Sequence, residues 1–417
     1  MKRRPAIALI VVVVFLLATA LAVRWAMRPQ VLGPQVLAMA GRALGLDISA
    51  REFDYRLRGH PEIVAHGVSA RVPGADTPLV EADRVLVSVP WSTLRSRGTD
   101  LRVQRVELDA PRLALEPFMA WWSQRPPGDG RMPELEDGLH VERGTVAGDG
   151  WLLRDLRLHL PRFSPDARLR AAVSGTWSNR SVEVPFDLHV AMTRPAMGAG
   201  IGAAGTVAPA AGEWRLLNRV TLSTRLADSI ARAGLQLQRI RLSSAARYES
   251  GGSTQDFGLG LAANGDYAGG ALTLAPAALS VRGQGLVPDL DGLGGMSFGE
   301  QLAFEVAGSM RQWPATWPAL PPPVGGSGAP LPFRLAYSGP ADLSDQLQLV
   351  LAHGDARFQG RLRAPDVISW LGALEGDTPL PPLEGRLDVP RIDMGGATLH
   401  GVEITVDEGD PGTGTGP

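Results

Sequence analysis

The sequence predicts a mainly β fold: an N-terminal transmembrane helix followed by an elongated, curled antiparallel β-sheet with an open apolar groove and a few short helices. Three observations predict this class. Apolar residues recur at every second position in many short segments after residue 47, as in strands with one buried face. The 50 glycines and 34 prolines are spread between these segments as turn signals. The run Ala6–Val23 is apolar except for Thr19.

The apolar run is the first element. As a helix its roughly 18 residues would rise about 27 Å, close to the thickness of a bilayer core. Lys2, Arg3 and Arg4 precede it, so we expect residues 1–4 to stay in the cytoplasm and residues 5–27 to form the anchor. A cleaved signal peptide is the alternative, because residues 18–20 and 20–22 resemble cleavage sites. Both readings place the body in the periplasm of a bacterial envelope, and the first makes the chain a single-pass inner-membrane protein.

Composition removes several classes of function. The formal net charge is only -2, which argues against a nucleic-acid partner. The absence of cysteine excludes disulfide scaffolds, cysteine-ligated zinc sites and a cysteine nucleophile. Lys2 is the only lysine, so Schiff-base and P-loop lysine chemistry are removed as well.

The body begins with a short amphipathic helix, predicted over Pro34–Leu46 with Gly45 near its end. Period-two alternation follows and is clearest over Ser181–Met192, where Pro185 implies a bulge or an edge position. Further strands are predicted at 84–89, 101–108, 156–160, 220–226, 235–242, 333–337, 347–351, 358–362, 387–389 and 399–406. Short helices or single turns are predicted at 91–97, 118–124, 227–233 and 366–374. Loops are predicted at 124–137, 194–213, 250–255, 287–295 and 313–332, and the tail 410–417 should be disordered.

Motifs that could carry chemistry are weak. Gly200–Gly205 matches G-x-G-x-x-G but lacks the required preceding strand and following helix, so we interpret it as a flexible loop. Asp289–Gly292 resembles the start of a calcium loop without its remaining ligands, and we interpret it as a polar turn. The seven histidines show no metal-binding spacing. We therefore expect a binding protein and not an enzyme, without a cofactor or a metal. Trp121–Trp122 and Trp313/Trp317 are either packing anchors or an aromatic rim that faces a membrane or a partner.

One set of segments resembles the AsmA family. The resemblance rests on Leu44–Asp47, Glu62–Val72, Val80–Val87, Trp91–Leu94 and Val103–Leu115, and more loosely on Leu383–Val406. It implies an inner-membrane anchor, a periplasmic sheet with an apolar-lined groove, and a role in phospholipid transport for outer-membrane biogenesis. No catalytic residues are implied. The resemblance divides the chain into an AsmA-like region at 28–120, a central β-rich region at 121–312, the 313–332 loop and a C-terminal β-rich region at 333–409.

The groove lining is expected on the apolar phase of each strand. The best-defined candidates are Val182, Val184, Phe186, Leu188 and Val190. The partners would be the inner membrane, phospholipid and other envelope proteins. Periodicity alone does not distinguish an open groove from a closed sandwich. The alternative function is a structural or assembly role, similar to the N subunit of type II secretion systems, which has the same plan of an anchor followed by β-structure.

Overall fold

A computed structural model describes most of the chain. The described residues are 37–38, 41–42, 44–57, 59–96, 102–124, 133–227, 234–283, 287–314, 317, 329–372, 382–394 and 397–406. Strands make up 68% of the structure, and they form curled sheet with few short helices, so the mainly β prediction is confirmed. Within the described residues no helix has the length and apolar character needed to cross a membrane. The predicted anchor and the tail 410–417 lie outside the described residues.

The chain divides into two compact units. Unit 1 comprises Met1–Pro165 and Ala171–Gly175, and unit 2 comprises Asp166–Arg170 and Thr176–Pro417. The predicted helix at the start of the body is present, because residues 37–38, 41–42 and 44 are helical. It ends as expected at Gly45, whose φ of 63° is accessible mainly to glycine.

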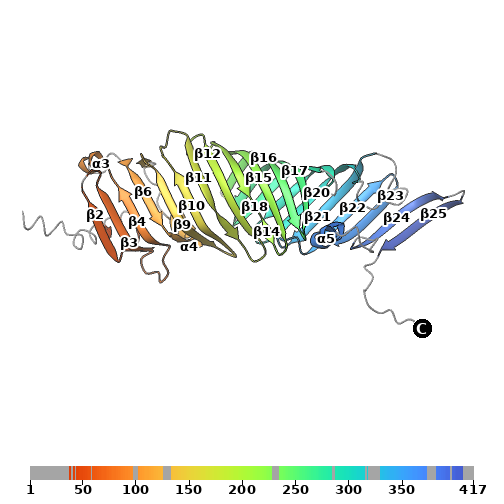
Figure 1. Ribbon diagram of the computed structural model, residues 1–417, viewed down its shortest axis with the longest axis horizontal. Helices are drawn as coiled ribbons and strands as arrows, with labels where there is room; N and C mark the ends of the chain where they lie inside the picture. The colour runs from red at the N-terminus through yellow and green to blue at the C-terminus, as the bar shows by residue number, and fades with distance from the viewer. Residues whose placement is uncertain are drawn as a thin grey trace, which may run out of the picture. The chain divides into compact units, whose positions relative to one another are not determined.

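Unit 1 is a mixed sheet (Figure 1). Its elements are β1 (Asp47–Ser49), β2 (Glu52–Arg56), β3 (Glu62–Arg71), β4 (Val80–Ser88), α3 (Trp91–Arg95), β5 (Arg102–Val103), β6 (Arg105–Asp109), β7 (Arg112–Ala114), α4 (Leu115–Ser123), β8 (Glu134–Leu135), β9 (Leu139–Gly148) and β10 (Trp151–Leu160). Strand β3 lies between β4 and the short strands β1 and β2. Strands β6 and β7 pair antiparallel with β4 but parallel with β9. Parallel neighbours must be joined by a crossover connection. The connection between β7 and β9 contains α4.

Helices α3 and α4 were expected as single turns, and α4 is longer than predicted. It begins at Leu115, directly after β7, and Pro117 lies in its first turn, where a missing N–H costs no helical hydrogen bond. Leu115 therefore starts a helix directly after the last strand residue, Ala114. Helix α3 matches the predicted turn at residues 91–97 within its described residues.

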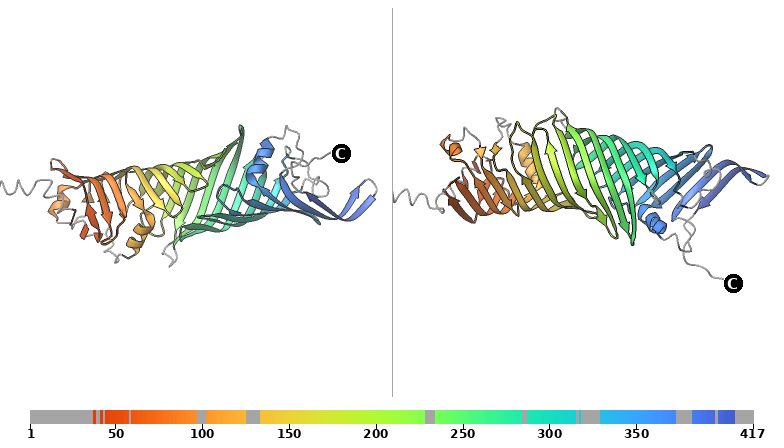
Figure 2. Two further views of the ribbon diagram at one scale, coloured as in Figure 1. Left: turned by 90° about the horizontal axis from the view of Figure 1, so that it is seen from below. Right: turned by 45° about the horizontal axis from the view of Figure 1, so that its top comes forward.

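Unit 2 is an antiparallel meander. Its strands are β11 (Leu169–Ser178, shared with unit 1), β12 (Glu183–Met192), β13 (Gly200–Val207), β14 (Ala210–Ala211), β15 (Trp214–Leu226), β16 (Leu235–Ser250), β17 (Ser253–Ala268), β18 (Ala271–Gly283), β19 (Asp289–Phe298), β20 (Leu302–Gln312), β21 (Leu331–Gly339), β22 (Gln346–His353), β23 (Ala356–Arg363), β24 (Leu383–Met394) and β25 (Ala397–Val406), with α5 (Ala364–Gly372) after β23. From β15 onward each strand pairs with the next one in the chain. Figure 2 shows this sheet curling along its length.

Most of the predicted strands are confirmed. The segments at 156–160, 220–226, 235–242, 333–337, 347–351, 358–362, 387–389 and 399–406 fall on strands, as does 84–89 except for its last residue. The segment 101–108 is divided at Gln104 into β5 and β6, and residue 101 lies outside the described residues. The bulge predicted at Pro185 is not present, because Phe186 pairs with Val207 and Glu183 pairs with Ala210, which is the same register on both sides of the proline. The partner of β12 changes from β13 to β14 beside this proline, and the carbonyl of Pro185 accepts from the N–H of Ala208, which lies between those two strands.

Two loop predictions were wrong, and a third covers a shorter turn than predicted. The segment 194–213 contains β13 and β14, and 287–295 contains the start of β19. Glycine and alanine carry no apolar alternation, so these strands gave no signal, although their backbone pairs fully with strands on both sides. The segment 250–255 is a two-residue hairpin turn in which Gly251 and Gly252 have φ values of 54° and 83°. Of 313–332, only residues 313–314, 317 and 329–332 are described, and β21 begins at Leu331.

Candidate functional site

One face of unit 2 carries an uninterrupted row of uncharged, mostly large apolar residues, which we call the apolar row. Strand register places its members opposite one another in turn. The row is Val190, Ala203, Leu222, Leu242, Leu261, Leu279, Gly292, Gly308, Phe333, Leu351, Phe358, Leu387 and Ile404. Side chains at positions i and i+2 of a strand share a face. The residues two positions before and after each member of the row therefore lie on the same face, and none of them is Asp, Glu, Lys or Arg. We call the whole surface the apolar face.

The apolar face is only partly buried. A buried cluster around Val306, Phe333 and Leu351 lies near its C-terminal part, and a second around Ile240 and Leu274 lies further toward the N-terminus. Between and beyond them the side chains of the row are mostly half-buried. No large side chain among the described residues is fully buried. A closed sandwich of this size would contain such side chains, because protein interiors are close-packed.

The apolar face is also uncharged. Among the described residues of β12–β21, the register places no Asp, Glu, Arg or His in the phase of the apolar row. Its few polar groups are paired. The Ser244 hydroxyl donates to Asn218 Oδ1 at 3.0 Å, and Thr224 Oγ1 donates to the carbonyl of Gln238 at 3.1 Å. Burial raises the pKa of the Tyr337 phenol, which favours its neutral form.

The face turns toward itself along the meander. Neighbouring strands are rotated by about 20–25°, so the six pairings from β12 to β19 rotate the sheet by about 120–150°. The rings of Trp177 on β11 and Phe298 on β19 lie 5.7 Å apart between centroids. This contact joins two distant strands of unit 2. The sheet therefore curls far enough for side chains of β11 and β19 to meet.

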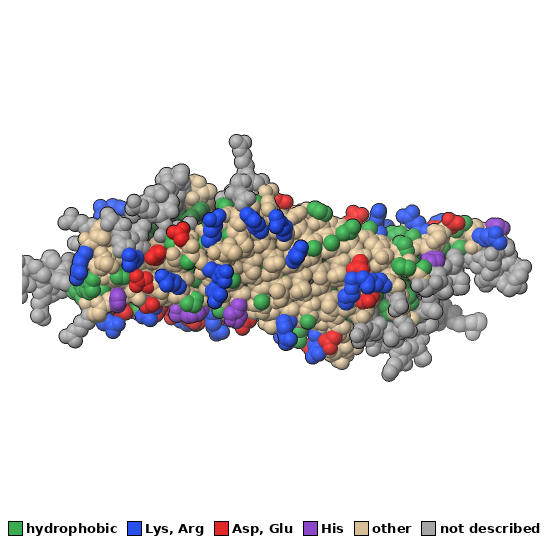
Figure 3. Space-filling model, turned by 90° about the horizontal axis from the view of Figure 1, so that it is seen from above, with side chains coloured by type: hydrophobic (Ala, Val, Ile, Leu, Met, Phe, Trp, Pro, Cys, Tyr) green, Lys and Arg blue, Asp and Glu red, His purple; other side chains and the backbone are tan. Residues whose placement is uncertain are grey.

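The opposite phase carries the charges. In unit 2, Arg247 pairs with Asp256 at 2.7 Å, and Asp291 accepts from both Arg282 and Arg311. These hydrogen bonds lower the pKa of Asp291 and that of Asp256. Figure 3 shows charged side chains standing in rows between wide areas of backbone and uncharged polar groups. Charge and apolar surface are thus separated onto the two sides of the sheet.

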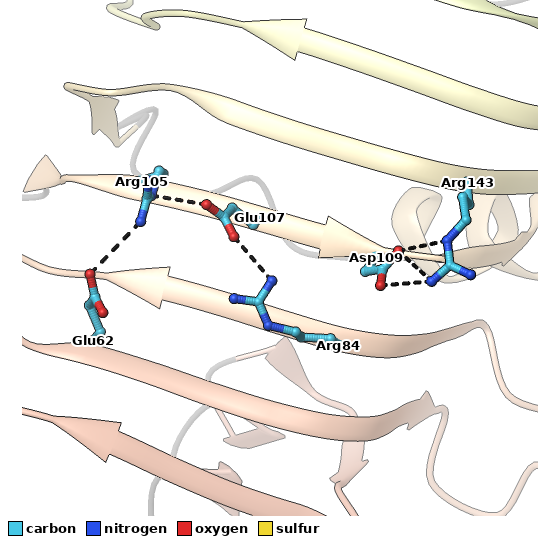
Figure 4. Close-up of polar contacts among 6 residues, drawn as sticks. All are labelled: Glu62, Arg84, Arg105, Glu107, Asp109 and Arg143. Atoms are coloured by element: carbon cyan, nitrogen blue, oxygen red, sulfur yellow. Dashed lines mark hydrogen bonds and ion pairs between the residues drawn. The ribbon is translucent and has the colours of Figure 1, made fainter.

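Unit 1 carries a similar ladder of cross-strand ion pairs. Figure 4 shows Glu62, Arg105, Glu107 and Arg84 linked in series across β3, β4 and β6. Beside them Arg143, in the left-handed region at φ 55°, donates two hydrogen bonds of 2.8 Å to the two carboxylate oxygens of Asp109. The bidentate pair raises the pKa of Arg143. All of these side chains bind one another, so they are not arranged to act on a substrate.

A hollow of about 770 Å³ lies over β18–β22. It is lined mainly from the charged phase, by small residues such as Gly295, Ala303 and Ala307 around the exposed Leu293. The small residues explain the hollow, since nothing fills the space beside the leucine. It lies on the other side of the sheet from the apolar face and brings no group of charges together.

The predicted lining residues share one phase of β12 and the turn before it. Val182 is buried, and Val184, Phe186, Leu188 and Val190 are half-buried, whereas Glu183, Asp187 and His189 between them are exposed. The alternation is therefore as predicted. Contact of these residues with a lipid stays a prediction. The sequence did not reveal how many other strands continue the same face.

The motifs considered for chemistry are structural. Gly200–Gly205 forms β13, and Asp289 and Asp291 are in β19. Asp289 Oδ1 accepts from the N–H of Gly283, and Asp291 is held by two arginines, so both carboxylates already have partners. Over the described part of the chain, no group of three or more His, Asp or Glu is placed to hold a metal ion. Trp121 and Trp122 lie on α4. The rings of Trp313 and Trp317 meet edge-on, with their centroids 4.8 Å apart. Trp313 also packs against the buried cluster around Phe333.

Comparison with known proteins gives no family assignment. No protein-family model matches the chain, and no curated protein or solved structure is detectably similar to it.

Proposed function

We propose that this chain is an inner-membrane-anchored periplasmic protein that binds or conducts phospholipid along the apolar face of unit 2. The observation that supports this proposal is the apolar row, which runs from β12 to β25 without a charged residue while most of its side chains stay half-exposed. A soluble protein rarely leaves so continuous an apolar surface uncovered, so an occupant is expected.

Acyl chains fit this surface by simple physical chemistry. Each methylene removed from water contributes about 0.8 kcal/mol, so a long chain is held without any specific polar contact. A trough open along its length also leaves the charged headgroup in water, where its solvation is retained. Such binding requires no fixed constellation of side chains, which agrees with the absence of catalytic motifs in the sequence.

The location follows from the N-terminal sequence. The apolar run Ala6–Val23, flanked by Lys2–Arg4 and by Arg24 and Arg28, would hold the chain in the inner membrane with its sheet in the periplasm. The resemblance to the AsmA family supports a role in outer-membrane biogenesis. In this role unit 2 would carry lipid away from the inner membrane.

Site-specific photo-crosslinking tests the proposal. Benzoyl-phenylalanine is placed at Leu188, on the apolar face, and in the matched variant at the neighbouring His189, on the opposite phase. Both variants are irradiated in cells grown with radiolabelled phosphate. We expect radiolabelled phospholipid on the protein from position 188 and not from position 189. Equal labelling at both positions, or none at 188 in a folded protein, contradicts the proposal.

The second candidate function is assembly of an envelope complex. Within the described residues β25 pairs with β24 alone, and it exposes Leu399 and Ile404 at 48% and 41%. An open strand of this kind is suited to adding a strand from a partner. Crosslinks from position 188 to protein and not to lipid would favour this function, similar to that of the N subunit of type II secretion systems.

A further inference from the structure

Helix α4 exposes large apolar side chains. None of its residues is buried, and Met119 and Trp122 are 53% and 57% exposed. Phe118, Trp121 and Trp122 form a ring cluster with centroids 5.4–6.1 Å apart. We call Phe118, Met119, Trp121 and Trp122 the aromatic patch. It belongs to unit 1 and is separate from the apolar face of unit 2.

The start of the helix is tied to the sheet of unit 1. The chain enters α4 directly from β7. In the first turn Glu116 Oε1 accepts from the backbone N–H of Asp149 at 2.7 Å, which ties the helix to the β9–β10 turn. Leu115, Phe118 and Trp121 lie at i, i+3 and i+6 and are half-buried, so the packing side of the helix is supplied by these residues. Met119 and Trp122 are left facing outward.

The chemistry of the patch matches a bilayer interface. Tryptophan is enriched at the headgroup level of membranes, because its ring is apolar and its N–H is polar. Glu116 is the only charged residue of α4, and it lies at the start of the helix and away from the exposed ring of Trp122. Apolar and tryptophan side chains exposed on a helix surface can be buried at the boundary between headgroups and acyl chains.

The length of the chain before unit 1 also points to a membrane surface as the partner of the aromatic patch. Residues 24–36 separate the apolar run Ala6–Val23 from the first described residues of unit 1. Thirteen residues span at most about 45 Å when fully extended. If the run is an anchor, unit 1 is thus restricted to the zone next to the membrane surface, where a patch of this kind meets lipid at high effective concentration.

We propose that α4 docks on the periplasmic surface of the inner membrane through Met119 and Trp122. This inference rests on the predicted anchor, but not on lipid binding by unit 2. Docking would fix the orientation of unit 1 relative to the membrane surface. A tether alone would leave that orientation free.

The absence of cysteine allows a direct test. In the full-length chain, Met119→Cys provides a single thiol for an NBD fluorophore, and Glu142→Cys on β9 of the same unit is the matched control, since its side chain is 63% exposed. Both proteins are reconstituted into vesicles of phosphatidylethanolamine and phosphatidylglycerol, with and without spin-labelled lipid. We expect several-fold stronger quenching and a blue-shifted emission for the label at 119. Trp122→Cys should repeat the result.

Two outcomes overturn the proposal. Equal quenching at 119 and 142 means that α4 has no preferred contact with the bilayer. Quenching at 119 that persists after transfer to detergent, with spin-labelled lipid still bound, means that α4 contacts carried lipid and not a membrane surface. Circular dichroism of each labelled protein confirms that the sheet is intact. Loss of crosslinks at Leu188 would affect only the function of unit 2, so the two proposals fail separately.

Discussion

The indole of Trp177 lies 5.7 Å from the ring of Phe298, at an interplanar angle of 50°, although 120 residues of sequence separate the two positions. Among the described residues of unit 2, the extensive contacts between strands are made by strands that follow one another closely in the chain. This pair is therefore a direct marker of the curl of the sheet. It joins two strands that are brought together only by the twist and curl of the sheet.

Replacing both rings should reveal a coupling between β11 and β19. An aromatic pair contributes about 0.5–1.5 kcal/mol beyond its buried area, so Trp177→Ala and Phe298→Ala should show that interaction energy in a double-mutant cycle. The measurement is urea unfolding followed by circular dichroism. A control cycle combines Trp177→Ala with Tyr248→Ala, whose ring stacks on Trp214, and should be additive. Additivity in both cycles would show that β11 and β19 are not in contact in solution.

Two glycines of β13 should respond differently to the same substitution. Gly205 has φ 153°, and a Cβ there would lie 2.0 Å from the carbonyl oxygen of Asp187, so Gly205→Ala should cost about 1–3 kcal/mol of unfolding free energy. At Gly202 the nearest atom to a Cβ is the carbonyl oxygen of Leu222 at 3.8 Å, an ordinary contact. Gly202→Ala should therefore be neutral or slightly stabilising. Thermal unfolding of the two variants measures the difference, and equal shifts would contradict the assigned register.

A charge on the apolar face should reduce lipid binding more than loss of a charge from the opposite phase. Leu188→Asp places a carboxylate in the half-buried lining, where its desolvation is unfavourable, and Val184→Asp does the same four residues away. Asp187→Ala removes an exposed group and should leave binding unchanged. The readout is the ratio of phospholipid to protein in gently purified full-length material, measured by mass spectrometry. Equal ratios of phospholipid to protein in all three folded variants would contradict the prediction that Val184 and Leu188 contact lipid.

The stabilisation by Asp291 should be lost in acid. Hydrogen bonds from Arg282 and Arg311 hold the pKa of this carboxyl below its ordinary value of about 3.9. A lowered pKa in the folded state stabilises the fold above the unfolded-state value, and this contribution disappears as pH falls through the lowered pKa. The difference in unfolding midpoint between the native chain and Asp291→Asn should be constant above about pH 5 and shrink below about pH 4. Because the site is exposed, added salt should weaken the effect, and an unchanged difference at low pH would contradict it.

The sequence predicted the strands whose side chains differ between their two faces. In β12 and β21 large apolar residues alternate with polar or small ones, in β15 the same alternation holds over residues 219–223, and each strand is present in the structure. Strands β13 and β19 were missed, because Gly, Ala and Ser provide no contrast between faces. Their pairing is determined by the strands on either side, which is a tertiary effect.

The candidate site was only partly predictable for the same reason. Val182–Val190 could be named from one segment, because the alternation lies within it. The apolar row depends on the register of every neighbouring pair, and register is not a local property. Likewise, nothing near Leu115 indicated that β9 would return parallel to β6 and β7, since this arrangement depends on the crossover that includes α4.

The meander also bears on how the chain can change in length during evolution. From β15 to β25 every strand runs opposite to its predecessor. Loss of a hairpin such as β22–β23 would bring β21 and β24 together with their antiparallel relationship intact, whereas loss of one strand would reverse the direction of all that follow. Each hairpin adds about 10 Å across the strands. Gene duplications and deletions that preserve folding should therefore lengthen or shorten this protein in steps of one hairpin, adjusting its reach without redesigning its surface.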